Sequence, residues 1–294
     1  MGAAMVRRLA QAGYPVTAYN RTRAKAEALA SEGVRVAGAP ADLAAADLVF
    51  TMLSGGDAVM GLLAGEQGLL GTGRGPRTLI DCSTMSVESS ADIRAALARA
   101  GTQFLAAPVS GNPHVVAAGK GACVASGPRA AFDAAAEALA AICPGVVHAG
   151  EGELARIAEI CHNLYVALVT ESLAEITLLA QRAGMRRGAF LEFLNVSPMG
   201  STYSRAKTPA FVKLDFSVTF TPQLMRRDVD LALELGRGLD VPLPLGSVVR
   251  DQLQRLIGHG WSDLDFSALL LLAAQSGGVK LAPEDDRPIG ADRG

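Results

Sequence analysis

The sequence has few charged and few aromatic residues, and this scarcity excludes several classes of protein. Only 19% of its 294 residues are charged and 5% are aromatic, and the net charge is −2. Half of the residues are hydrophobic, which excludes a disordered chain. The balanced charge excludes a protein that binds nucleic acid through a basic surface. We therefore expect about two folded domains and no nucleic-acid partner.

Long apolar runs, leader sequences and paired cysteines are also lacking. A membrane helix needs about 18 consecutive apolar residues. The best candidate, 163–180, is interrupted by Glu171 and Glu175, and no basic segment followed by an apolar one opens the chain. The four cysteines form no C-x-x-C pair, so we expect buried thiols and neither disulfides nor a metal site; they are Cys82, Cys123, Cys143 and Cys161. These absences predict a soluble, cytoplasmic protein without membrane contact.

Short apolar runs alternate with helical segments over the first 150 residues. The expected strands are 15–19, 47–53, 78–81, 103–107, 121–126 and 146–148, and the expected helices are 1–12, 24–31, 88–100 and 129–142. Such alternation is typical of βαβ units and of a parallel sheet covered on both faces. We predict an α/β domain over 1–150.

The pattern becomes entirely helical after Gly150. Residues 153–183 have helical apolar spacing without glycine or proline, which at 1.5 Å per residue gives a helix of roughly 45 Å. Shorter helices are expected at 187–195, 222–235, 247–259 and 263–276. We predict an all-α domain over 151–294, entered through this long interdomain helix, with a disordered tail at 283–294.

The first residues fit a dinucleotide-binding unit that lacks its first strand. Gly2 would be the last glycine of a G-x-G-x-x-G fingerprint, whose first two glycines are missing from this sequence. The next strand ends in Asn20, Arg21 and Thr22. An arginine at this place fits the 2′-phosphate of NADP, whereas a carboxylate would bind the ribose of NAD. A solvated turn with a helix cap at Thr22 explains these three residues equally well.

Several further motifs occur in order along the whole chain. They are Thr51-Met52-Leu53, Ile80-Asp81-Cys82-Ser83-Thr84, Ala107-Pro108-Val109-Ser110-Gly111, the helix carrying Asn163, Arg227-Asp228 and Asp263-Leu264-Asp265-Phe266-Ser267. With these motifs the chain resembles the β-hydroxyacid dehydrogenase family, which includes 3-hydroxyisobutyrate dehydrogenase and is related to 6-phosphogluconate dehydrogenase and the imine reductases. The resemblance implies a Rossmann-like domain, a linking helix and a helical domain that forms a homodimer or homotetramer. It also implies hydride transfer between NAD(P) and a small-molecule substrate.

The resemblance also implies roles for particular residues. The positions expected to bind the cofactor, NADP with NAD as the alternative, are Gly2, Asn20, Arg21, Thr22, Leu53, Ser54, Thr84 and Arg227. Ser110 and Gly111 would bind the substrate carboxylate, and Asn163 would belong to the catalytic site. No metal is implied.

One position departs from the family. The family's catalytic lysine lies four residues before the asparagine, and here that residue is Glu159. A buried glutamate with a raised pKa can act as an acid, and a carboxylate there also favours a cationic substrate such as an iminium ion. The alternative is that Glu159 is a solvated helix glutamate, paired with Arg156, that takes no part in catalysis.

Three hypotheses follow for the function. The first is an NADP-dependent oxidoreductase acting on a small hydroxyl or carbonyl compound, with Glu159 as its active-site acid. The second is an imine reductase-like enzyme. The third is an inactive, truncated nucleotide-binding homologue, which the missing strand and the missing lysine both favour.

Overall fold

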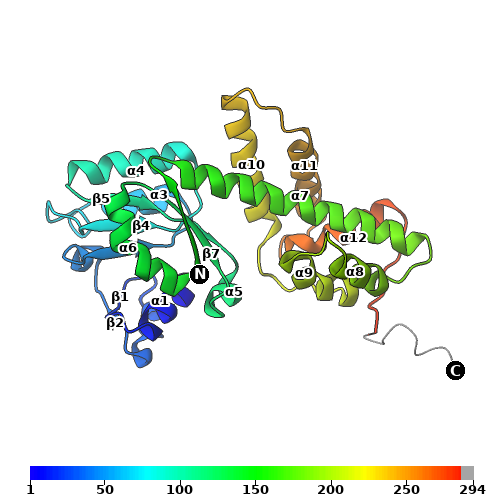
Figure 1. Cartoon of the computed structure of the whole chain (residues 1–294), viewed down its shortest axis with the longest axis horizontal. Coiled ribbons are helices and arrows are strands. Elements are labelled where there is room, and N and C mark those ends of the chain that lie inside the picture. Colours follow the sequence, from blue (N-terminus) through cyan, green and yellow to red (C-terminus); the bar gives the residue numbers. More distant parts are fainter. Residues whose placement is uncertain (286–294) are drawn as a thin grey trace. The chain divides into compact units, whose positions relative to one another are not determined.

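The computed structural model describes residues 1–285, and its first unit, Met1–Glu159, is built around a mixed sheet of six strands (Figure 1). The central strands β3 (Leu48–Thr51), β4 (Thr78–Asp81) and β5 (Gln103–Ala106) are parallel neighbours. Three more strands extend the sheet beyond β5; they are β7 (Ala122–Ser126), β6 (Val109–Ser110) and β8 (Gly145–Gly150). The carboxyl ends of β3 and β4 therefore meet at one edge of the sheet.

The direction of β7 differs from the sequence-based expectation. This strand runs antiparallel to both β5 and β6, so a fully parallel sheet is wrong. Between β6 and β7 the chain forms only the short helix α5 (Pro113–Ala117). A parallel connection needs a longer crossover, and this segment does not supply one.

The strands β1 (Thr17–Ala18) and β2 (Arg35–Val36) form a separate parallel pair. Within residues 1–285 no strand joins β1 to β3. This agrees with the expectation of a Rossmann-like sheet without its first strand.

Helices cover both faces of the main sheet. On one face α1 (Gly2–Gln11), α5 and α6 (Arg129–Ile142) pack on Ile80 and Leu105. On the other face α3 (Gly56–Leu63) and α4 (Val87–Arg99) pack on Leu79 and Phe104. Successive residues of a strand point to opposite faces, so β4 and β5 contribute to both cores. The remaining helix of this unit is α2 (Arg23–Glu27). The doubly wound architecture is confirmed.

The second unit begins at Ile160, within the long helix α7 (Leu154–Arg182), which confirms the predicted helix over 153–183. The other helices of this unit are α8 (Arg187–Val196), α9 (Thr202–Lys213), α10 (Pro222–Gly238), α11 (Pro244–Gly258) and α12 (Leu269–Ser276). Their core includes Leu191, Phe211, Val229, Leu253 and Leu270. In the described chain α7 is long and apolar enough to cross a membrane. It contributes Ala167, Leu173 and Ala174 to this core.

The segment after α12 is bound to α8. Glu284 accepts hydrogen bonds from the backbone N–H groups of Arg187 and Gly188, both at 2.9 Å. The buried guanidinium of Arg187 donates to the carbonyl oxygen of Ala282 at 2.6 Å. The prediction of a disordered tail at 283–294 is therefore wrong for Glu284, because this side chain caps the beginning of α8. Residues 286–294 lie outside the described residues.

The cysteines follow the prediction at three positions. Cys82, Cys123 and Cys143 are buried, whereas Cys161 on α7 is exposed. Burial raises the pKa of Cys123 to about 12 and that of Cys143 to about 11. The buried thiols are therefore protonated and unreactive at neutral pH.

Candidate functional site

A network of buried polar side chains occupies the carboxyl ends of β3 and β4. The Thr51 hydroxyl donates to Oδ1 of Asp81 at 2.6 Å, and the Ser83 hydroxyl donates to the same oxygen at 2.8 Å. Ser83 Oγ in turn accepts a hydrogen bond from the backbone N–H of Leu53 at 2.9 Å. Ligands of parallel α/β sheets bind outside the carboxyl ends of the strands, so this network lies where a dinucleotide is expected.

A fully buried arginine crosses this network from the first turn of α7. Arg156 forms an ion pair with Asp81, which is also fully buried. Its other donors reach the carbonyl oxygen of Ser83 at 2.5 Å and the hydroxyl of Ser90 at 3.2 Å. A buried charge is tolerated only when it is paired and hydrogen-bonded, and Arg156 meets both conditions.

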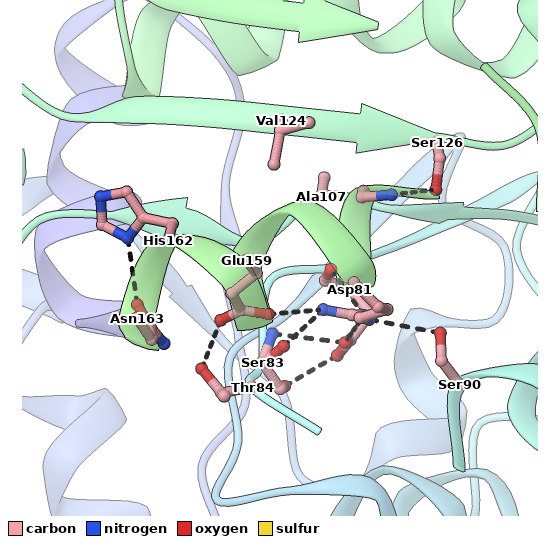
Figure 2. Close-up of polar contacts among 12 residues, drawn as sticks. Asp81, Ser83, Thr84, Ser90, Ala107, Val124, Ser126, Glu159, His162 and Asn163 are labelled. Atoms are coloured by element: carbon pink, nitrogen blue, oxygen red, sulfur yellow. Dashed lines mark hydrogen bonds and ion pairs between the residues drawn. The ribbon is translucent and has the colours of Figure 1, made fainter. Parts of the chain in front are cut away.

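The Glu159 carboxylate lies next to this arginine. Its Oε1 accepts a hydrogen bond of 2.5 Å from the Thr84 hydroxyl, and its Oε2 lies 3.6 Å from Nη1 of Arg156. Figure 2 shows the Thr84 and Glu159 side chains pointing toward each other. Only 9% of Glu159 is exposed, so the interpretation as a solvated helix glutamate is wrong, although the pairing with Arg156 is real.

The charges of the network do not cancel. Asp81 and Glu159 share the single guanidinium of Arg156, and Asp81 makes the closer contact. With both carboxylates ionised, the three groups carry one net negative charge. Of the two carboxylates, Glu159 lies farther from the guanidinium and is the more exposed.

The residues expected to bind the cofactor lie on several loops of the first unit. Asn20 and Arg21 follow β1, and the Asn20 side chain accepts a hydrogen bond from the Thr22 N–H at 2.9 Å. Arg21 is exposed and has no ion-pair partner within residues 1–285. Gly2 opens α1 beside Met52, the residue after β3. An exposed guanidinium and a helix N-terminus are the groups that bind the phosphates of a dinucleotide, so these residues fit NADP.

The loop after β3 is shaped by close packing. A Cβ on Gly56 would lie 2.5 Å from Cβ of Ser89, so only glycine lets the start of α3 approach α4 this closely. Ser54 lies on this loop and is exposed. The Thr84 hydroxyl is directed to Glu159, so the structure gives Thr84 a partner other than a cofactor. Its expected contact with the cofactor stays a prediction.

Ser110 and Gly111 lie between β6 and α5. Gly111 has a φ of +136°, and a Cβ there would lie 3.0 Å from Val115. Asn112 caps α5 by accepting a hydrogen bond from the Val115 N–H at 3.0 Å. The structure therefore explains this glycine by the turn, and the expected contact with a substrate carboxylate stays a prediction.

Asn163 and Arg227 belong to the second unit and share a partner there. Asn163 donates to Oδ2 of Asp228 at 3.0 Å, and Arg227 forms an ion pair of 3.0 Å with Oδ1 of the same residue. Burial raises the pKa of Asp228, while Arg227 and Asn163 oppose the increase. The Arg227 charge is therefore directed to its neighbour Asp228.

Sequence reasoning named Asp81 and Ser83 only within a motif and Arg156 only as a partner of Glu159, and it assigned none of the three to the site. Two signals could have revealed the ion pair. Asp81 ends an otherwise apolar strand, and Arg156 lies among the small and apolar residues that begin α7. A charge in a buried position needs an opposite charge nearby.

The comparisons with known proteins agree with this geometry. One family description, the NAD binding domain of 6-phosphogluconate dehydrogenase, matches residues 1–150. A second, NAD-binding of NADP-dependent 3-hydroxyisobutyrate dehydrogenase, matches residues 150–273. A doubly wound sheet, the polar network at its carboxyl edge and these matches define an NAD(P)-dependent oxidoreductase.

Similar proteins narrow this class to one family. The uncharacterized oxidoreductase YfjR of Bacillus subtilis (strain 168) is 34% identical over 272 residues, which are 92% of this chain and 95% of that protein. An NAD-dependent L-serine dehydrogenase of Pseudomonas aeruginosa is 28% identical over 277 residues, covering 92% of this chain and 93% of its own. The chain belongs to the β-hydroxyacid dehydrogenase family, among proteins similar to 3-hydroxyisobutyrate dehydrogenase.

Solved structures share the whole fold. The 3-hydroxyisobutyrate dehydrogenase of Mycobacterium tuberculosis, solved with L-serine, has a TM-score of 0.81 and 27% identity, and the match covers 92% of this chain and 95% of that one. An imine reductase from Pseudomonas sp. has a TM-score of 0.59 and 20% identity, with coverage of 93% and 95%. The second similarity extends to the fold alone.

Proposed function

We propose that this protein transfers hydride between NADP(H) and a small hydroxyl or carbonyl substrate, with Glu159 as the group that moves the proton. The observation that carries the proposal is the position of the Glu159 carboxylate. It is nearly buried and is held by Thr84 beside the carboxyl ends of β3 and β4. A carboxylate held in this way is suited to general acid–base catalysis.

The cofactor supplies or accepts the hydride at the substrate carbon. When a hydroxyl substrate is oxidised, its proton passes to the Glu159 carboxylate. In the reverse direction the protonated Glu159 returns the proton to the carbonyl oxygen. Ser110 and the backbone N–H of Gly111 hold the polar end of the substrate, and Arg21 binds the 2′-phosphate, which favours NADP over NAD.

The charge of the network favours a second candidate, an imine substrate. One net negative charge attracts an iminium ion and repels the carboxylate of a simple hydroxy acid. The two candidates differ in the group that receives the hydride, a C=N carbon or a C=O carbon. One panel of substrates therefore separates them.

The test compares Glu159→Gln with the parent protein in the NADPH-dependent reduction of carbonyl compounds and cyclic imines, and in the oxidation of hydroxy acids and L-serine. Loss of a general acid costs about 10²–10⁴-fold in rate, so most of the activity should disappear while the affinity for NADPH is unchanged. The matched control is Glu153→Gln, because Glu153 directly precedes the same helix and is ion-paired with Arg94. Full activity of Glu159→Gln would refute the role of Glu159. NADPH binding without turnover of any compound would favour an inactive nucleotide-binding homologue.

The assembly and the location of the protein are further parts of the proposal. We expect a homodimer or homotetramer in the cytoplasm. The second unit exposes large apolar side chains on α8, where Phe193 is 64% and Val196 is 80% exposed. Apolar patches of this kind commonly form contacts between subunits.

A further inference from the structure

The role of the buried Arg156 in the proposed reaction can be derived from its contacts. Besides Glu159, the guanidinium binds Asp81 and Ser83 at the end of β4 and Ser90 on α4. These contacts fix it independently of Glu159. The Asp81 carboxylate is in turn fixed by Thr51 and Ser83. Arg156 is therefore a rigid positive charge at 3.6 Å from Glu159 Oε2.

The Glu159 carboxylate makes contacts through both of its oxygens. The Thr84 hydroxyl binds Oε1, and the Arg156 guanidinium faces Oε2. Two contacts on different oxygens define the orientation of the carboxylate plane, which a single hydrogen bond does not. A hydroxyl donor and a cation both stabilise the ionised form of a carboxylate.

We propose that Arg156 is a positioning residue that orients the Glu159 carboxylate and lowers its affinity for the proton, and that Asp81 tunes this effect by taking part of the guanidinium charge. The inference rests on the proposed function of Glu159. It assigns a task to two fully buried residues. Because Asp81 and Arg156 act on Glu159 with opposite signs, changing each of them moves the proton affinity in a different direction.

Charged and titratable groups of the first unit lie near Glu159. Arg156 faces it from its own helix, and Asp81 lies behind Arg156 at the end of β4. Cys123 on β7 is close enough for Glu159 to raise its pKa, but burial keeps that thiol neutral below about pH 12. Over the pH range of an assay this thiol adds no charge, whereas Asp81 and Arg156 do.

The experiment measures the titration of Glu159 directly, by NMR of the full chain labelled with ¹³C at the glutamate carboxyl carbon. The Glu159→Gln spectrum identifies the resonance. The double variant Asp81→Asn/Arg156→Gln neutralises both members of the ion pair, so it removes the cation near Glu159 without leaving an unpaired buried charge. The titration midpoint of Glu159 should then rise by about one to two pH units. Asp81→Asn alone leaves the whole guanidinium charge to Glu159 and should lower the midpoint.

Two controls separate electrostatics from a loss of structure. Arg156→Lys keeps the positive charge, so the titration midpoint of Glu159 should stay within about half a pH unit of the parent value. Arg94→Gln removes another guanidinium that anchors the start of α7, through Glu153 and the carbonyl oxygen of Gly152, and should leave the midpoint unchanged. Thermal unfolding of every variant verifies that it is folded.

The outcomes are distinguishable from a failure of the proposed function. An unchanged midpoint in the double variant, or shifts of the same sign in both variants, overturns the role of Arg156. Shifts of opposite sign support it, and they do so even if Glu159→Gln proves fully active. In that case only the acid–base role of Glu159 is refuted.

Discussion

The carboxylate of Glu171 on α7 should make the second unit less stable as the pH rises. Glu171 is only 7% exposed, and within the described chain its Oε2 has no hydrogen-bond partner. Burial raises its pKa to about 7, and repulsion from Glu175 adds to the increase, against a hydrogen bond from Gln252 and the charge of Arg255. The folded protein therefore binds this proton more tightly than the unfolded chain does.

The size of the effect follows from the two pKa values. The pKa rises from 4.5 in the unfolded chain to about 7 in the folded one, and each unit corresponds to 1.36 kcal/mol, so ionisation costs about 3 kcal/mol. The full stability is present below pH 4.5, and the loss accumulates as the pH rises from 4.5 through 7. Glu171→Gln removes the ionisation and keeps the shape of the side chain. At pH 8 it should stabilise the protein by about 3 kcal/mol, and at pH 4.5 it should have little effect.

Urea unfolding followed by circular dichroism between pH 4.5 and pH 8.5 measures this difference. Glu175→Gln is the matched control on the same helix. Glu175 is exposed, and its removal relieves only the repulsion, so most of the pH dependence should persist. If the curves of Glu171→Gln and the parent protein stay parallel over the whole range, burial of this carboxylate has no cost and the reasoning fails.

Three further predictions concern the cofactor, the thiols and the assembly. Arg21→Asp should reduce the preference for NADP over NAD by about 10- to 100-fold, since a charge-assisted contact with phosphate is lost. The control is Arg35→Asp, the same charge change at the start of β2, which should leave the ratio of the NADP and NAD affinities unchanged. A thiol reagent should modify Cys161 alone in the folded protein and all four cysteines in urea, and rapid reaction of a second thiol would contradict the burial described above. Sedimentation velocity at micromolar concentration should show a dimer or tetramer that Phe193→Glu with Val196→Glu dissociates, and a monomeric parent protein would exclude this interface.

The elements with a strong local pattern could be predicted from the sequence. The helix α7 has apolar spacing without glycine or proline, and β4 is a short apolar run, so both were predicted within one residue of their bounds. The helix α9 was not predicted, because it contains Pro209 and few apolar residues. Proline interrupts the helical pattern, and here the tertiary packing of Phe211 and Val212 outweighs that signal.

The contacts of the candidate site could be predicted only in part. The resemblance to the family selected Glu159. The pairing with Arg156 followed from local spacing, because the two residues are three apart on one helix. The partners Asp81 and Thr84 lie 75 residues before Arg156 and Glu159, respectively. Such pairs depend on the register of the sheet against α7, which no local pattern encodes. The burial of Glu159 could not be predicted for the same reason.

The separate pair of strands β1 and β2 has a consequence for local stability. A two-stranded sheet is marginally stable in water, and its backbone hydrogen bonds open more readily than those of a larger sheet. The amides of β1 and β2 should therefore exchange with deuterium faster than those of β3, β4 and β5. Because Arg21 follows β1, a dinucleotide bound at Arg21 should make the opening of this pair less frequent. Slower exchange in these two strands would then report cofactor binding in the absence of a substrate.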